Sequence, residues 1–180
     1  MTMMNMSRFG LAWCAAALAL DGCGAGSEAQ NPPTTGRVDV EAWVSQGLYK
    51  DWHCEPAAHD QRSPSPHGKN RICSNDALSA HGSGAYPVDA AAVKELYDAA
   101  GTSVVGIAVY RKVSTATTGD AWYFYERVPL DSPAPHDANG VVADGLGTSG
   151  AAKTICVGCH AGAGSDAQHS GHDFVYTQVK

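Results

Sequence analysis

Val104–Val113 (VVGIAVYRKV) and Ala121–Val128 (AWYFYERV) are two stretches rich in β-branched and aromatic residues, joined by a short Thr- and Gly-rich connection. A third stretch of the same kind, Ala90–Tyr97 (AAAVKELY), precedes them. Such runs, bounded by turn-forming residues, predict strands, and a short connection between two strands predicts that they pair antiparallel. The three stretches therefore predict an antiparallel sheet at the centre of the fold.

Outside this predicted sheet the sequence favours short helices and loops. Asn75-Asp76 can cap a short helix. Glu55–Lys69 and Asp131–Gly150 are rich in Pro, Gly and Ser and are expected to be a loop and a connection. The fold class is therefore α+β, mainly antiparallel β-sheet with a few short helices. A further helix is predicted from apolar residues at helical spacing, which are Val40, Trp43, Val44 and Leu48.

The length and charge of the chain limit its organisation and its partners. Its 180 residues correspond to one ordinary domain plus a short extra segment. The chain has 12 Lys and Arg against 18 Asp and Glu, for a formal net charge of −6. Because phosphate binding requires clustered cations, this balance argues against nucleic acid as a main partner. We expect one folded domain over residues 38–180.

Residues 1–22 have the features of a secretory signal peptide. Arg8 supplies a positive charge, and the apolar run Phe9–Leu20 is shorter than the about 20 residues that a membrane-spanning helix requires. Two cleavage sites fit this segment. Leu20–Cys23 (LDGC) resembles a lipobox that would leave Cys23 as a lipidated N-terminus, and Ser27–Ala29 (SEA) would instead release a soluble protein.

We favour the lipobox because a cysteine stands so soon after the apolar run. Residues 23–37 are small, polar and Pro-rich and are expected to form a flexible linker. The predicted location is therefore periplasmic or anchored to the outer membrane, with membrane contact only through the lipid on Cys23.

The segment Cys156-Val157-Gly158-Cys159-His160 is the C-x-x-C-H pattern of c-type haem attachment. Two thiols one helical turn apart can add to the two haem vinyl groups, and His160 then lies under the iron as its axial ligand. The alternatives are a zinc half-site, a redox pair and a structural disulfide. Zinc requires further ligands, and a thioredoxin-like pair requires a βαβ context that the sequence lacks. We expect one covalently attached haem c at Cys156, Cys159 and His160.

Two other cysteines remain in the expected folded domain. Cys54 and Cys73 are expected to form a disulfide in an oxidising compartment. The alternative is a pair of buried, unpaired thiols.

The sixth coordination position of the expected haem iron has no obvious protein ligand. All four methionines lie within residues 1–6, so the mature chain cannot form a His/Met pair. Either another histidine completes a bis-His site, or the distal face is open to a small molecule. The other histidines are His53, His59, His67, His81, His136, His169 and His172.

Several shorter motifs follow one another in a set order before the C-terminal CxxCH. They are Ser65–Gly68 (SPHG), Arg71 followed by Asn75, Val93–Leu96 (VKEL), Val109 with Lys112, and Trp122–Tyr125 (WYFY). This order resembles the cytochrome P-460 and cytochrome c′-β family, from about Trp43 to the C-terminus. The resemblance implies a mainly antiparallel β fold, a five-coordinate haem with an open distal pocket, and commonly a homodimer.

The resemblance gives Lys94 a special role. It matches the lysine that cytochromes P-460 join covalently to the porphyrin, and these proteins oxidise hydroxylamine, whereas c′-β members bind gases such as nitric oxide. Ala92, Lys94 and Leu96 would share one strand face, which places the amine among apolar neighbours. The alternative is an edge lysine that reaches solvent or pairs with a carboxylate, for which the candidates are Glu95, Asp98 and Glu126.

One departure from the family concerns proton transfer. Hydroxylamine-oxidising members carry a distal glutamate on the strand after the lysine, and the matching stretch here is Gly106-Ile107-Ala108. The sequence thus predicts an exported mono-haem c-type cytochrome of P-460 type. It would either oxidise hydroxylamine or bind nitric oxide, and it would exchange electrons with a redox partner protein. The missing glutamate weakens the enzymatic interpretation. The alternative is a six-coordinate bis-His electron carrier.

Overall fold

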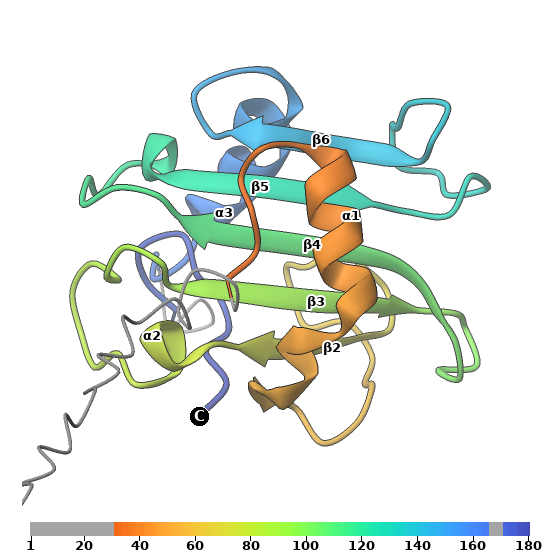
Figure 1. Ribbon diagram of the computed structural model, residues 1–180, viewed down its shortest axis with the longest axis horizontal. Coiled ribbons are helices and arrows are strands. Elements are labelled where there is room, and N and C mark those ends of the chain that lie inside the picture. The colour runs from red at the N-terminus through yellow and green to blue at the C-terminus, as the bar shows by residue number, and fades with distance from the viewer. Residues whose placement is uncertain (1–30, 166–170) are drawn as a thin grey trace, which may run out of the picture.

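The fold is built on one antiparallel sheet of six strands, arranged in the order in which they occur along the chain (Figure 1). The computed structural model describes residues 31–165 and 171–180. Each strand pairs with the next one in sequence, so the sheet is a series of hairpins, and the expected antiparallel sheet is confirmed. The strands are β1 (His53–Cys54), β2 (Asn70–Ser74), β3 (Ala91–Tyr97), β4 (Val104–Lys112), β5 (Trp122–Arg127) and β6 (Val141–Leu146).

Helix α1 (Arg37–Gln46) covers one face of this sheet (Figure 1). It buries Val40 and Trp43 against a cluster that includes Tyr123 and Tyr125 of β5. The helix ends at Gly47, whose φ of 70° lies in the left-handed region that terminates many helices. The helix predicted from the spacing of apolar residues is therefore confirmed for Val40, Trp43 and Val44, whereas Leu48 lies in the 3₁₀ turn that follows Gly47.

The opposite face of the sheet carries the C-terminal part of the chain (Figure 1). Because side chains alternate along a strand, Trp122 and Phe124 point away from α1. They pack with Cys156 of the π-helical segment η3 (Ala152–Val157), which continues into α3 (Gly158–His160). The CxxCH motif thus lies on the face that α1 does not cover.

The remaining short elements lie between the strands. Helix α2 (Asp76–Ser79) begins where predicted, with the Asn75 side chain accepting the Leu78 N–H at 3.0 Å. The 3₁₀ turns are η1 (Leu48–Asp51) and η2 (Gly119–Ala121). None of the helices in the described part of the chain is long and apolar enough to cross a membrane.

The prediction of a connection over Asp131–Gly150 was wrong in part, because β6 lies within it. A turn before this strand is held by Asp137, whose carboxylate accepts the Val141 N–H at 2.9 Å. Strand β6 then pairs with the outer edge of β5. The partner strand satisfies backbone groups that β5 would otherwise leave open, a need that the local composition does not reveal.

The N-terminal boundary of the folded part also differs from the prediction. Residues 31–36 were expected to belong to a flexible linker, yet Pro32 is almost completely buried. Its carbonyl accepts a hydrogen bond from Arg111 Nη1 at 2.9 Å. The segment before α1 is therefore part of the domain, while the proposed signal segment and Cys23 lie outside the described residues.

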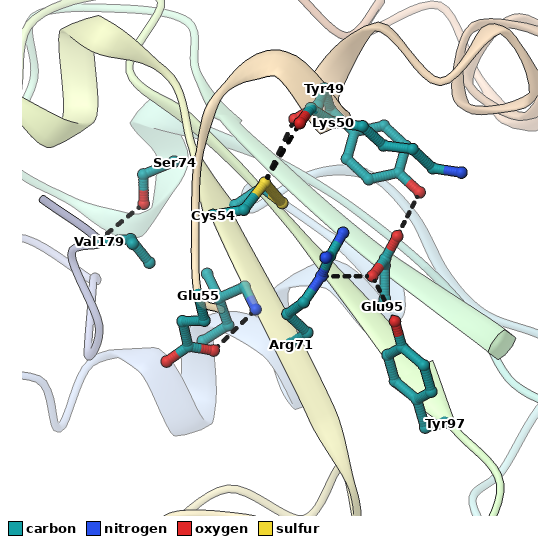
Figure 2. The surroundings of a disulfide bond; sticks show 11 residues. Tyr49, Lys50, Cys54, Glu55, Arg71, Ser74, Glu95, Tyr97 and Val179 are labelled. Atoms are coloured by element: carbon teal, nitrogen blue, oxygen red, sulfur yellow. Dashed lines mark hydrogen bonds and ion pairs between the residues drawn. A yellow bond between two sulfur atoms is a disulfide. The ribbon is translucent and has the colours of Figure 1, made fainter. Parts of the chain in front are cut away.

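The expected disulfide between Cys54 and Cys73 is confirmed (Figure 2). The two residues are direct partners in the β1–β2 register, with their Cα atoms 4.0 Å apart. The bond fixes the short strand β1 to the sheet at the start of the loop that leads to the site described below.

Candidate functional site

A cavity lies between the sheet and the CxxCH segment and opens to solvent; its empty space, part of which is open solvent, measures about 630 Å³. Strands β3, β4 and β5 supply one wall, and the loop between β1 and β2 and the segment η3–α3 supply the others. The structure therefore brings the four residues that the sequence predicted for a haem site to one place. These residues are Lys94, Cys156, Cys159 and His160.

The CxxCH segment is held against the sheet by close contact between glycines and Val157. A Cβ atom added to Gly119 would lie 2.3 Å from Val157 Cγ1. A Cβ atom added to Gly147 would lie 2.2 Å from the carbonyl oxygen of Gly119. Only glycine allows this approach, so these positions set the distance between the motif and the sheet.

The His160 ring is oriented by a hydrogen bond from its Nδ1 to the carbonyl oxygen of Phe174, at 2.6 Å. Because a carbonyl only accepts, Nδ1 must carry the proton, and Nε2 keeps the lone pair that binds a metal. Burial lowers the pKa of His160 to about 4, an effect that the Phe174 hydrogen bond partly offsets. The imidazole is therefore neutral at pH 7, which is the form that ligates metals.

Aromatic rings surround His160. The ring centroids of Tyr110, Phe124 and Tyr176 lie 5.5–5.8 Å from that of His160, all nearly edge-on. Such packing limits rotation of the imidazole and gives the cavity an apolar wall.

The two cysteines of the motif are unpaired, with Cys156 buried and Cys159 exposed. Burial raises the pKa of the Cys156 thiol to about 12. A redox CxxC pair needs a thiolate of lowered pKa, so this environment does not suit that alternative. Two free thiols, a neutral imidazole and an aromatic wall fit the covalent attachment and axial ligation of a c-type haem.

Lys94 is on β3, an interior strand, and its side chain lines the cavity. Burial lowers the pKa of its ammonium group, and the charge of Glu126 partly offsets this shift. Glu95 points to the other face, where it accepts hydrogen bonds from Tyr49 and Arg71. Of the carboxylates considered as partners for Lys94, Glu126 is therefore the one that shares its cavity.

Glu126, which the sequence suggested only as an ion-pair partner for Lys94, is the acidic group of the cavity. Ala108 pairs with Lys94 on one side and with Glu126 on the other, so the three residues lie on one face across adjacent strands. The methyl group of Ala108 leaves room for both long side chains above it. Glu126 is 8% exposed. Burial raises its pKa, and the positive charge of Lys94 offsets part of this rise. Strand β4, on which the family carries its glutamate, has Ala108 as the sequence indicated. The carboxylate of this cavity comes instead from the next strand, β5.

A sequence signal for Glu126 did exist. It follows Trp122 and Phe124 at the alternating positions of an aromatic strand, and this places it on the same face as those rings. A carboxylate on such a face is uncommon unless it is paired or has a function.

His67 also lines the cavity. Apart from His160, it is the one histidine in the described ranges that does. Its Nε2 lies 3.6 Å from Glu126 Oε1, and its buried Nδ1 has no hydrogen-bond partner among the described residues. Burial lowers the pKa of His67 to about 3, helped by the charges of Lys94 and His160. Another candidate sixth ligand, His169, lies outside the described residues.

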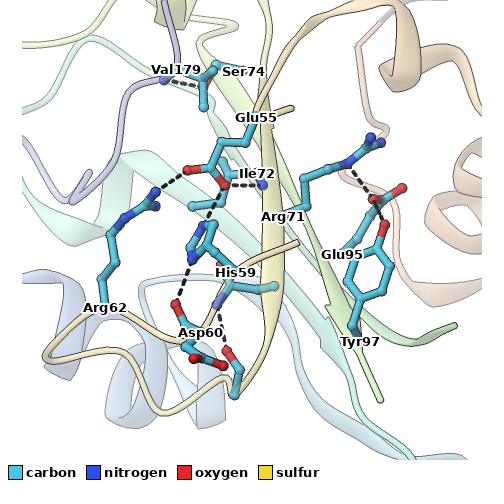
Figure 3. Close-up of polar contacts among 12 residues, drawn as sticks. Glu55, His59, Asp60, Arg62, Arg71, Ile72, Ser74, Glu95, Tyr97 and Val179 are labelled. Carbon is cyan, nitrogen blue, oxygen red and sulfur yellow. Dashed lines mark hydrogen bonds and ion pairs between the residues drawn. The ribbon is translucent and has the colours of Figure 1, made fainter. Parts of the chain in front are cut away.

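The loop that carries His67 is held by the buried carboxylate of Glu55 (Figure 3). Glu55 accepts hydrogen bonds from Arg62 at 2.6 Å, from the Ile72 N–H at 2.8 Å and from His59 at 2.9 Å. Burial alone would raise the pKa of Glu55, but these three bonds outweigh burial and lower it. The Glu55 carboxylate thus fixes the loop above the cavity.

Within residues 31–165 and 171–180, no three or more His, Cys, Asp or Glu side chains gather in a way that could hold a metal ion. No protein-family model and no curated protein matches this chain. The function is therefore inferred from the chemistry of the cavity itself.

Proposed function

We propose that this chain is an exported mono-haem c-type cytochrome of P-460 type that oxidises hydroxylamine or a related small nitrogen compound. The observation that carries the proposal is the cavity in which the CxxCH residues, a half-buried lysine and a buried carboxylate meet. Cys156 and Cys159 would hold the haem, and His160 would be the axial ligand. When bound, the haem would supply an iron centre that coordinates the nitrogen compound and accepts its electrons.

Glu126 would accept protons from the substrate. Oxidation of N–H and O–H groups releases protons, and a base must lie within hydrogen-bond reach of them. The buried carboxylate of Glu126 lies in the same cavity as His160, and its pKa is raised toward the range that suits proton transfer. The released electrons would pass to a redox partner protein.

Lys94 would modify the porphyrin. Burial favours its neutral amine, which is the nucleophilic form. A covalent bond from Nζ to a ring carbon, which the family resemblance implies, would replace an N–H bond and a ring C–H bond. This is a two-electron oxidation that requires a peroxide-class oxidant, and it would leave no ammonium charge in the cavity wall. The same resemblance implies a homodimer, and the N-terminal segment implies a periplasmic or lipid-anchored location.

Absorption spectroscopy of the protein, produced in a host that attaches c-type haem, tests this proposal. A red-shifted reduced Soret band and turnover with hydroxylamine plus an electron acceptor would support it. An ordinary high-spin spectrum with nitric oxide binding and no turnover would favour a c′-β-like gas-binding protein. Protein without thioether-bound haem would refute both.

A second candidate function rests on His67. Its Nδ1 is buried without a partner among the described residues, and its ring lines the same cavity as His160. Ligation by His67 would give a bis-His electron carrier. Sharp low-spin bands in wild-type protein that disappear in His67→Ala would establish this alternative.

A further inference from the structure

The carbonyl oxygen that accepts the His160 proton belongs to a turn with an uncommon backbone conformation. Asp173 and Phe174 have φ angles of 45° and 67°, in the left-handed region that residues other than glycine rarely adopt. Two such residues in succession persist only where the surrounding contacts hold them. The contacts that hold this turn therefore also position the carbonyl oxygen of Phe174.

A buried ion pair holds the turn to the sheet. Asp173 Oδ2 accepts hydrogen bonds from Lys112 Nζ at 2.5 Å and from the Tyr86 N–H at 2.7 Å. The side chains of Lys112 and Asp173 are 0% and 6% exposed. Lys112 is the last residue of β4, which also carries Ala108 of the cavity wall. The pair thus links the turn to the same strand that forms the cavity.

Contacts on either side of Asp173 and Phe174 complete the turn. The Val175 N–H donates to the carbonyl oxygen of His172 at 2.9 Å, and Val175 is completely buried. The His172 ring stacks on Tyr86 at a centroid distance of 4.6 Å. Between His172 and Val175, Asp173 is the residue that makes a charged contact. It directly precedes Phe174, whose carbonyl oxygen accepts the hydrogen bond from His160.

We propose that Lys112 and Asp173 are positioning residues for the proximal histidine. By fixing the turn, they hold the Phe174 carbonyl against Nδ1 of His160, and this keeps the proton on Nδ1 and leaves Nε2 for the iron. A strong hydrogen bond at Nδ1 makes the imidazole a more basic ligand. The inference rests on the proposed function only in taking His160 as the axial ligand.

The test compares Asp173→Asn and the double variant Lys112→Met/Asp173→Asn with wild type. The double variant removes both charges, so it leaves no lone buried ion that could prevent folding. Glu95→Gln is the matched control, because Glu95 is also a buried, ion-paired carboxylate, on the other face of the sheet. The readouts are the iron–histidine stretching frequency of the reduced haem protein, by resonance Raman spectroscopy, and its midpoint potential.

Both Asp173 variants are expected to lower the stretching frequency and raise the midpoint potential, because the hydrogen bond to His160 weakens. Glu95→Gln is expected to lose stability but to keep both values of the wild type. Unchanged values in both Asp173 variants, or an equal shift in the control, would overturn the proposal.

If wild-type protein acquires no haem, the proposed function fails, but the positioning of His160 can still be tested. The ¹⁵N chemical shifts of its ring in the haem-free full chain report which nitrogen carries the proton. The proton is expected on Nδ1 in wild type and Glu95→Gln, and to leave Nδ1 partly in the Asp173 variants. The same tautomer in all four proteins would refute the inference.

Discussion

Lys94 and Glu126 face one cavity from strands that are not neighbours in the sheet, and Ala108 on the strand between them pairs with both residues. Burial pushes the pKa of the lysine down and that of the glutamate up, so each group is driven toward its neutral form. A nucleophilic amine and a carboxyl group that can exchange protons thus share the space beside His160.

Replacing Glu126 by Gln should remove the proton acceptor while keeping the shape of the cavity. We expect hydroxylamine turnover to fall by about 10²- to 10⁴-fold, the range that general bases contribute, with nitric oxide binding retained. The carboxylate acts only when ionised, so wild-type activity should decline as the pH falls through a pKa raised above the ordinary 4.5. Steady-state rates across pH measure this, and an unchanged rate in Glu126→Gln would exclude Glu126 as the base.

Replacing Lys94 by Arg should keep a long basic side chain in the cavity but prevent a covalent bond to the porphyrin. We expect the variant to show an ordinary c-type spectrum, whereas the wild type shows a red-shifted reduced Soret band. Mass spectrometry of tryptic peptides checks the bond directly. Recovery of the wild-type Lys94 peptide in free, unmodified form would contradict the cross-link.

The disulfide between Cys54 and Cys73 should stabilise the fold chiefly through the unfolded chain. The two residues are 19 positions apart, and a loop of this size corresponds to about 3 kcal/mol in the chain-entropy model. The double variant Cys54→Ser/Cys73→Ser should lose about that much free energy of unfolding in chemical denaturation. Reduced wild-type protein serves as the control and should match the variant; equal stability of oxidised protein and variant would show that the bond contributes nothing.

Acid should release the loop that Glu55 holds above the cavity. The folded-state pKa of Glu55 is depressed, so its contribution is present above the ordinary value of 4.5 and is lost as the pH falls through the depressed pKa. The reciprocal hydrogen bonds between His59 and Asn70 should then open, which lowers the hydrogen-exchange protection factors of these two amides. The Val128 amide, bonded to Gly140 far from the loop, should stay protected.

The variant Glu55→Gln provides the matching control for this pH effect. It keeps a side-chain oxygen for the Ile72 N–H but carries no charge, so its loop protection should not change over the same pH range. A pH response as large as that of the wild type would assign the effect to another group.

Gly147→Ala should disturb the seating of the CxxCH segment. The added Cβ would lie 2.2 Å from a backbone oxygen, which cannot move without shifting the turn that Val157 packs against. We expect lower thermal stability and less haem attached per protein. Gly158→Ala, inside the motif, meets nothing closer than 3.9 Å and should attach haem normally. Equal haem content in the two variants would show that this contact is not needed.

Some of these features follow from local sequence alone. The alternation of aromatic and β-branched residues fixed the strands around Lys94 and Phe124, because a strand exposes alternate residues to opposite faces. The Asn75 cap and the first helix also follow from short-range rules. The Cys54–Cys73 pairing followed from counting the cysteines that had no other expected role.

Other features depend on which strands become neighbours. The sequence predicted a connection where β6 lies, because only the assembled sheet shows that β5 pairs with a second strand beside β4. It suggested Glu126 only as a partner for Lys94 and not as the acidic group of the cavity, because that placement depends on the register of β5 against β4.

The sequence by itself therefore determined the CxxCH motif, the strand faces and the disulfide, since each depends on residue type and spacing. Only the tertiary structure decided that Glu126 and His67 join Lys94 beside His160, and that Lys112 reaches Asp173. These contacts join residues far apart in the chain, and they form only when strand register and the packing of the C-terminal segment bring those residues together.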